Sequence, residues 1–151
     1  MPGGLGENGN PRNADWRAET NTAGDSFGYA VRPAGDVNND GVDDLIATAY
    51  GFDVPSGGGT LNGAGAWFVW YGGTRGLGED GIPSNADMAG YGSQAGGVLG
   101  LDDCSSGDIN QDGRDEIFVL SLYYTNPEQS EGAVFGYDTV RLPNYLPLIA
   151  R

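Results

Sequence analysis

The feature that most constrains the fold is a tandem repeat, because the chain contains two copies of one unit. Residues 4–44 align without a gap to residues 76–116, at an offset of 72 residues, and 18 of these 41 positions are identical. The copies then differ in the length of one loop, and they return to the same register at Gly65 and Gly132. A repeated unit of this kind buries its faces against its neighbours rather than alone. We therefore expect a repeat architecture.

Each unit reads as four short strands separated by glycine-rich turns, with no helical periodicity. The third strand of each unit is a continuous apolar run, which is typical of a strand covered on both faces. The chain has 28 glycines, yet hydrophobic residues make up 38% and aromatic residues 11%, so the glycines indicate turns rather than disorder. We predict an all-β chain. The predicted strands lie at residues 15–19 and 87–89, from Phe27 and from Leu99 to the acidic loops, at 44–48 and 116–120, and at 66–71 and 133–137.

The charge is strongly acidic, with 21 Asp and Glu against 7 Lys and Arg, a net charge of −14 and a pI near 4.1. This balance argues against a nucleic-acid partner and against an anionic membrane surface, since both require basic residues. The acids are also clustered, because residues 36–44 and 108–116 hold four each. Clustered carboxylates repel one another unless a cation lies between them. A metal ion is the leading explanation.

Several other functions are disfavoured by what the sequence lacks. It contains no histidine, which removes the commonest general base, the His-dependent nucleophiles and most zinc sites. The lone Cys104 cannot form an intrachain disulfide. No stretch approaches the ~20 apolar residues of a membrane span, and the first residues lack the regions of a signal peptide. A leader has been removed, or the chain is a piece of a longer protein. We expect no enzyme.

The two acidic stretches have the spacing of calcium loops. Alternate oxygen-bearing side chains at positions 1, 3 and 5, glycine at 6, a backbone carbonyl at 7 and a carboxylate at 9 supply the hard oxygen ligands that Ca²⁺ takes. Asp43 and Asp115, at position 8, are expected to point outward. The predicted ligands are Asp36, Asn38, Asp40, Val42 and Asp44 in the first loop, and Asp108, Asn110, Asp112, Arg114 and Glu116 in the second.

An EF-hand is excluded, because position 12 is Ala47 or Val119 instead of the required glutamate. The alternative without metal is a pair of Asx-turns that cap hairpins. The second site is the weaker prediction, since Glu116 is longer than an aspartate and Arg114 brings a positive charge nearby. Magnesium fits less well, because it prefers a strict octahedron and keeps its waters.

With these residues in view, the chain resembles the FG-GAP repeats of integrin α-subunits and of many secreted bacterial proteins. The resemblance rests on Phe27-Gly28, on the acidic loop and on the run from Gly65 to Tyr71. The second copy is similar but departs from the pattern, with Leu99 in place of Phe. The resemblance implies one four-stranded β-propeller blade per repeat, calcium in a hairpin loop, and roles in adhesion, partner binding or scaffolding without chemistry.

On this basis we expect two blades in tandem, an incomplete propeller. The predicted units are residues 1–72, with the outer strand first, residues 73–138, and an extended apolar tail at residues 139–151. The first unit opens with a surplus outer strand and the second lacks one. The N-terminal strand is therefore expected to complete the second blade of another copy by strand addition, giving a ring or a filament. The alternative is that the missing blades are covalent neighbours in a longer chain.

The resulting functional prediction is a non-catalytic, extracellular calcium-binding module that binds proteins and associates with itself. A second possibility, from a different class, is an accessory propeller fragment of a secreted hydrolase or of an adhesin. An independent enzyme ranks third. The acids outside the loops that would have to serve it are Asp25, Asp53, Asp102 and Asp103.

Overall fold

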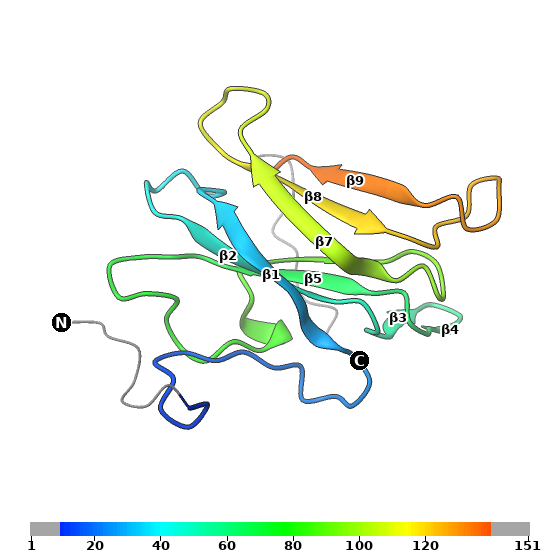
Figure 1. Cartoon of the computed structure of the whole chain (residues 1–151), viewed down its shortest axis with the longest axis horizontal. Coiled ribbons are helices and arrows are strands. Elements are labelled where there is room, and N and C mark those ends of the chain that lie inside the picture. The colour runs from blue at the N-terminus through cyan, green and yellow to red at the C-terminus, as the bar shows by residue number, and fades with distance from the viewer. Residues whose placement is uncertain (1–9, 140–151) are drawn as a thin grey trace.

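The computed structural model describes residues 10–139. Within that range the chain is all-β, with antiparallel sheets of four, two and three strands and no α-helix (Figure 1). The elements are β1 (Phe27–Gly35), β2 (Asp44–Ala49), β3 (Val54–Ser56), β4 (Gly59–Leu61), β5 (Ala66–Trp70), the 3₁₀ turn η1 (Pro83–Asn85), β6 (Met88–Tyr91), β7 (Leu99–Gly107), β8 (Glu116–Ser121) and β9 (Ala133–Tyr137).

The four-stranded sheet has the order β1-β2-β5-β6. Its central strands β2 and β5 carry the buried apolar run that the sequence predicted, and all five residues of β5 are buried. The outer strand β6 pairs with β5, Trp67 opposite Gly90 and Val69 opposite Met88. This strand lies in the second repeat by sequence but in the first sheet by pairing. The sheet therefore crosses the expected unit boundary at residue 72.

The strand predicted at residues 15–19 is wrong. This segment forms one isolated parallel bridge, between Ala18 and Gly81, and no strand. The physical reason is that the edge of β5, which this segment would have joined, already pairs with β6. It packs instead across the sheet, where the Trp16 ring meets the Trp70 ring edge-on at 5.5 Å.

The second sheet has the order β7-β8-β9 and matches the first three strands of the first sheet. The four expected strands are thus present in the first sheet, and the second sheet has three, as expected for a unit that lacks its outer strand. Within the described range, β9 pairs with β8 on one side only, because no later segment plays the part that β6 plays for β5. Its alternate residues are half-buried and exposed, and Val134 is 67% exposed.

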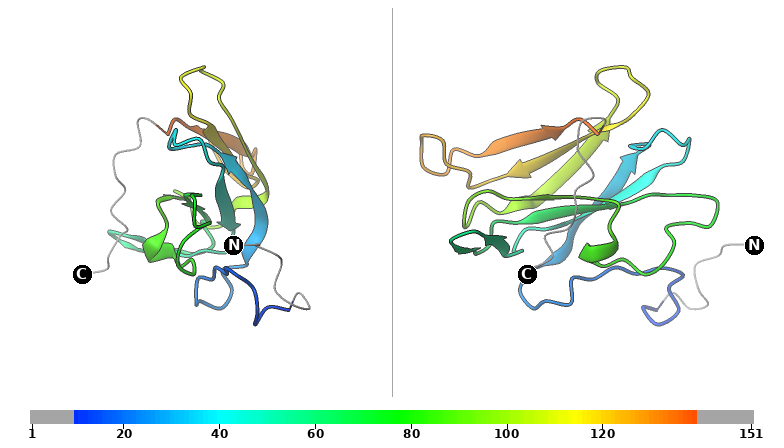
Figure 2. Two further views of the ribbon diagram at one scale, coloured as in Figure 1. Left: turned by 90° about the vertical axis from the view of Figure 1, so that its left-hand side faces the viewer. Right: turned by 180° about the vertical axis from the view of Figure 1, so that it is seen from behind.

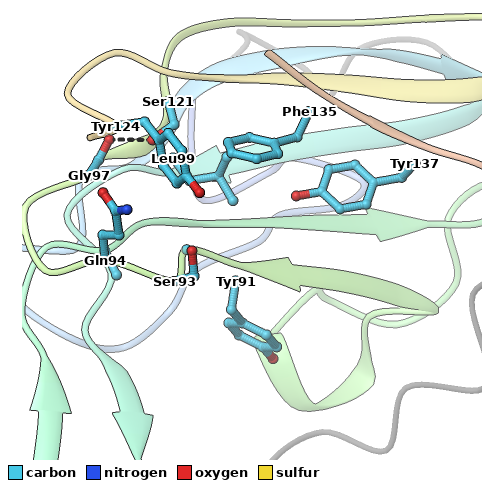
Figure 3. A pocket seen from close by; sticks show the side chains of 11 residues that line it. Tyr91, Ser93, Gln94, Gly97, Leu99, Ser121, Tyr124, Phe135 and Tyr137 are labelled. Carbon is cyan, nitrogen blue, oxygen red and sulfur yellow. Dashed lines mark hydrogen bonds between the residues drawn. The ribbon is translucent and has the colours of Figure 1, made fainter. Parts of the chain in front are cut away.

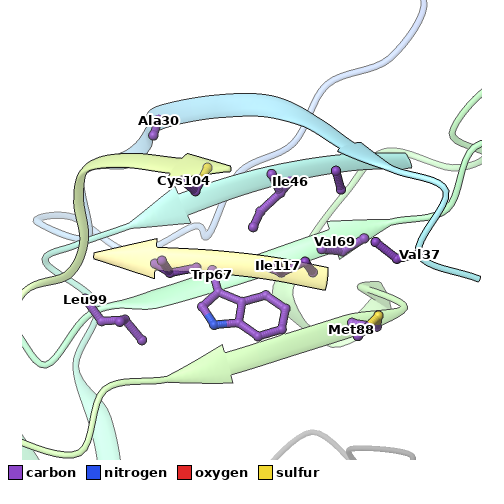
Figure 4. Close-up of a cluster of buried hydrophobic side chains, with 11 residues drawn as sticks. Ala30, Val37, Ile46, Trp67, Val69, Met88, Leu99, Cys104 and Ile117 are labelled. Carbon is purple, nitrogen blue, oxygen red and sulfur yellow. The ribbon is translucent and has the colours of Figure 1, made fainter. Parts of the chain in front are cut away.

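The two larger sheets pack on one another, as Figure 2 shows from two further sides. A buried cluster between them joins Ile46, Trp67, Val69 and Met88 of the first sheet to Leu99, Cys104, Ile117 and Val119 of the second (Figure 4). A second cluster, built on Phe68 and Trp70, lies on the other face of the first sheet. Trp16, Ala18 and Leu77 are among the residues that cover it.

The strand β7 approaches the first sheet closely because Gly100 has no side chain. A Cβ at Gly100 would lie 2.7 Å from Thr48 Cβ, and the residue has a φ of +84°. In the space that results, Thr48 Oγ1 donates a hydrogen bond to the Gly100 carbonyl at 2.8 Å and accepts one from Ala30 N at 3.2 Å. The packing of one sheet on the next is thus fixed by specific polar contacts as well as by apolar burial.

The described range contains no helix long and apolar enough to cross a membrane. Of the predicted tail at residues 139–151, all but residue 139 lies outside the described residues. A propeller as a whole is not established by two packed sheets.

Candidate metal centre

The first acidic loop joins β1 to β2 and is held by its own side chains. Asp36 accepts hydrogen bonds from Asp40 N at 2.9 Å and from Gly41 N at 2.8 Å. Asn38 accepts a second bond from Asp40 N at 2.9 Å, and Asp40 accepts from Val42 N at 2.9 Å. Gly41 has a φ of +86°, which a glycine adopts without strain. The alternation of oxygen-bearing side chains therefore curls the loop inward, as its spacing predicted.

Asp44 closes the first loop from the start of β2, where it is 3% exposed. Its two oxygens accept from Val37 N at 3.0 Å and from Gly72 N at 2.8 Å. Burial raises the pKa of the Asp44 carboxyl to about 6, the two backbone N–H groups oppose that rise, and the charges of Asp40 and Asp36 add to it. A bound cation stabilises the charged form of such a carboxylate, because it offsets both the loss of solvent and the repulsion from the acidic neighbours.

The second loop joins β7 to β8 and repeats this arrangement. Asp108 accepts from Asp112 N at 3.1 Å and from Gly113 N at 3.0 Å, and Asp112 accepts from Arg114 N at 3.0 Å. Asn110 Oδ1 also accepts from Asp112 N, at 2.9 Å. The backbone agrees as well, since Gln111 and Gly113 have φ values of +62° and +90°, against +60° for Asn39 in the first loop. The two loops share one conformation.

The loops differ at position 9. Glu116 accepts from Ile109 N at 3.0 Å, as Asp44 accepts from Val37 N, but its other oxygen accepts from Asn110 Nδ2 at 2.8 Å. The extra methylene thus carries the carboxylate toward the other side chains of its own loop. The Arg114 side chain lies at the neighbouring loop, where Nη1 donates to the Val37 carbonyl at 3.3 Å.

The structure adds one acidic residue that the sequence analysis missed. Oxygens of Asp112, Glu116 and Asp138 lie within 4.8 Å of one another, and no other such group of three or more occurs in the described range. Asp138 directly follows β9 and stands where the first repeat has Tyr71. The sequence could not place it, because only the pairing of β9 with β8 brings it beside Glu116.

The donor set fits a hard divalent cation. Eight of the ten predicted ligands have an oxygen-bearing side chain, and the other two, Val42 and Arg114, would contribute only their backbone carbonyls. The hydrogen bonds within the loops are of the Asx-turn type, so they also fit the alternative without metal. A carboxylate has about four acceptor positions, however, and each Asp36 oxygen receives one bond. Capacity for a cation therefore remains.

A small cavity lies away from the acidic loops, between the two larger sheets (Figure 3). Its volume is about 50 Å³, and its lining includes Tyr91, Leu99, Phe135 and Tyr137. Pockets for organic ligands usually measure ~300 Å³ or more. We assign no ligand to it.

Comparison with known families identifies one part of the chain. The family model of the FG-GAP repeat matches residues 27–70, which span β1 to β5 and include the first acidic loop. The match does not extend to the second repeat. A search of curated proteins finds no match. The resemblance is therefore shown for the first unit, and the second unit is related to it by the internal repeat and by the shared loop conformation.

Proposed function

We propose that this chain, which carries an FG-GAP repeat at residues 27–70, is a non-catalytic structural and protein-binding module stabilised by calcium. The observation that carries the proposal is the agreement between the two acidic loops. They share ligand spacing, side-chain hydrogen bonds and positive φ values, although the family model matches only the first. FG-GAP repeats often bind calcium.

The residues that would hold the ions are the ten predicted from the sequence, with Asp138 added to the second site. Calcium supplies positive charge between carboxylates that otherwise repel, so its effect is on stability rather than on chemistry. We propose an extracellular location, where modules with calcium Kd values of about 10⁻⁴–10⁻³ M are found.

Thermal unfolding tests this proposal. A ligand that binds only the folded state stabilises it by about 2.7 kcal/mol per site at a concentration one hundred times Kd. For a chain of this size that raises Tm by roughly 5–10 °C. Calcium should produce this shift, excess EGTA should abolish it, and magnesium should produce less. A melting curve unchanged by EGTA would contradict the calcium assignment.

A matched pair of variants localises the effect to the first loop. Asp36→Ala removes a carboxylate that accepts two hydrogen bonds within the loop and is a predicted ligand. Asp43→Ala removes the same charge from an exposed position of the same loop. The first should weaken calcium binding more than the second. Equal losses in titration calorimetry would show that only the net charge matters.

We also propose that the chain associates with itself through the open edge of β9. The supporting observation is that β5, the equivalent strand, is covered by β6, whereas Val134 of β9 is 67% exposed. If residues 16–19 of a second copy paired with β9 in the register of β6, Trp16 would lie opposite Gly136. That segment would first have to leave the Trp70 ring.

Light scattering at micromolar concentration, with and without calcium, tests the association. A dimer, ring or filament that Trp16→Ala abolishes supports strand addition. A stable monomer in both conditions argues for missing blades supplied by a longer chain. Finding a catalytic domain in the same reading frame would favour instead an accessory fragment of a hydrolase.

A further inference from the structure

The two acidic loops are in direct contact through a pair of hydrogen bonds between Asp36 and Asp115. Asp36 N donates to Asp115 Oδ2 at 2.7 Å, and Asp115 N donates to the Asp36 carbonyl at 3.1 Å. Both backbone groups of Asp36 are thus bonded to one residue of the second loop. Asp115 points away from its own loop, as expected of position 8, and its carboxylate reaches the neighbouring loop.

The contact extends on either side of this pair. Arg114 Nη1 donates to the Val37 carbonyl at 3.3 Å. A Cβ added at Gly113 would lie 3.7 Å from the Asn39 side chain, and a Cβ added at Gly35 would overlap the Asp115 carboxylate. Gly35 therefore leaves the space that Asp115 occupies. Three consecutive positions of the second loop, residues 113–115, therefore meet residues 35–39 of the first loop and its flank.

Asp36 and Asp115, the two residues that bond the loops together, also help to position the predicted calcium ligands. The Asp36 side chain holds the turn of the first loop through Asp40 N and Gly41 N, and it is the first predicted ligand. In the second loop, Asp115 lies between Arg114 and Glu116, the predicted ligands at positions 7 and 9. A shift in either loop therefore moves the ligand-bearing backbone of the other.

We propose that Asp115 is a positioning residue for the first calcium loop and that the two loops bind calcium with positive cooperativity. The inference rests on the calcium function proposed above. The ion that binds first orders both loops. The second ion then binds a loop that is already ordered, so its binding loses less conformational entropy. The coupling is reciprocal by thermodynamic linkage, and typical couplings begin at about fivefold in affinity.

Titration calorimetry on the full chain measures the coupling. Asp112→Asn disables the second site while it keeps an oxygen for the Arg114 N–H. The Kd of the first site should then rise about fivefold or more. Salt near 0.5 M shortens the Debye length to about 4 Å, which screens the plain loss of charge. An unchanged first-site Kd would overturn the proposal.

The role of the Asp115 side chain is tested by repeating the measurement in variants of this residue. In an Asp115→Ala background, Asp112→Asn should alter the first-site Kd clearly less than in the wild type, because only the Asp115 N–H bond to the Asp36 carbonyl and the Arg114 contact remain between the loops. In an Asp115→Asn background the coupling should persist, because the amide oxygen still accepts from Asp36 N. Asp43→Ala, at the same position of the first loop, is the matched control and should leave the coupling intact. Equal coupling in the Asp115→Ala and Asp43→Ala backgrounds would overturn the role of Asp115.

The two proposals fail in different ways. A chain that binds no calcium contradicts the proposed function itself. A chain that binds two calcium ions independently retains that function and overturns only the cooperativity. If Asp115→Ala does not fold by circular dichroism, Arg114→Ala removes the neighbouring contact to Val37 and should reduce the coupling without abolishing it.

Discussion

The two sheets arise from copies of one repeat, yet they differ in how completely they are covered. In the first sheet β5 is buried along its whole length and carries Trp67, Phe68 and Trp70. In the second sheet the matching strand β9 carries Val134, Phe135 and Tyr137, all half-buried or exposed. The first sheet also has a fourth strand, which the described part of the second lacks.

This difference shows where the outer strand of a repeat comes from. β6 follows β5 in the chain and belongs by sequence to the next repeat, so a sheet is completed only when more chain follows it. The outer face of the first sheet is closed in another way, by Trp16 and its neighbours. One end of the described structure is therefore capped from within the chain, and the other presents an open edge.

The largest expected effect separates the equivalent strands β5 and β9. Trp67 is fully buried between the sheets, so Trp67→Ala should lower the free energy of unfolding by about 3–5 kcal/mol. Val134, its repeat equivalent, is mostly exposed, and Val134→Ala should cost less than about 0.5 kcal/mol. Urea denaturation of both variants measures the difference. Similar losses would mean that Val134 is buried in solution and would refute this account of the exposed face of β9.

A smaller effect is expected at two glycines, Gly90 of β6 and Gly136 of β9. A Cβ at Gly90 would lie 2.3 Å from the buried Trp67 ring, so Gly90→Ala should cost about 1–3 kcal/mol. A Cβ at Gly136 meets the Phe118 ring at 2.8 Å, but Phe118 is only half-buried and can turn aside. Gly136→Ala should therefore change stability by less than about 0.5 kcal/mol. Denaturant midpoints compare the two, and a larger loss at Gly136 would refute this account of the sheets.

The sequence predicted most of the fold because its signals are local. The repeat, the buried run of β2 and the turn glycines placed β1, β2, β5, β7, β8 and β9 within a few residues of their observed bounds. The prediction failed at residues 15–19, since Trp16 and Met88 occupy equivalent positions but only Met88 meets a free strand edge. It also missed the short hairpin of β3 and β4, whose loop carries no alternating pattern.

The candidate site divides in the same way. Spacing alone indicated the ten loop residues, because a calcium loop is a continuous segment. The parts contributed by Asp138 and Asp115 could not be foreseen. Asp138 reaches Glu116 through strand pairing, and Asp115 reaches Asp36 through the packing of one sheet on the next. Neither contact leaves a trace in the spacing of residues along the chain.

The smallest expected effect concerns pH and the first loop without metal. The folded state raises the Asp44 pKa from 3.8 to about 6, chiefly by burial, so the folded chain holds this proton more tightly than the unfolded chain does. The contribution of Asp44 to stability is thus greatest below pH 4 and is lost as the pH rises through 6. With solvent screening, the loss is on the order of 1 kcal/mol.

Urea denaturation in EDTA between pH 4 and 7 isolates this contribution by comparing the wild type with Asp44→Asn. The variant carries no titrating group at position 44, so its stability should fall less as the pH rises. Asp43→Asn removes one charge from an exposed position and controls for net charge. Calcium should restore at neutral pH the stability that ionised Asp44 costs, because a bound cation takes the place of the proton. Parallel pH profiles for wild type and Asp44→Asn would show that Asp44 is not the group that makes the metal-free first loop costly.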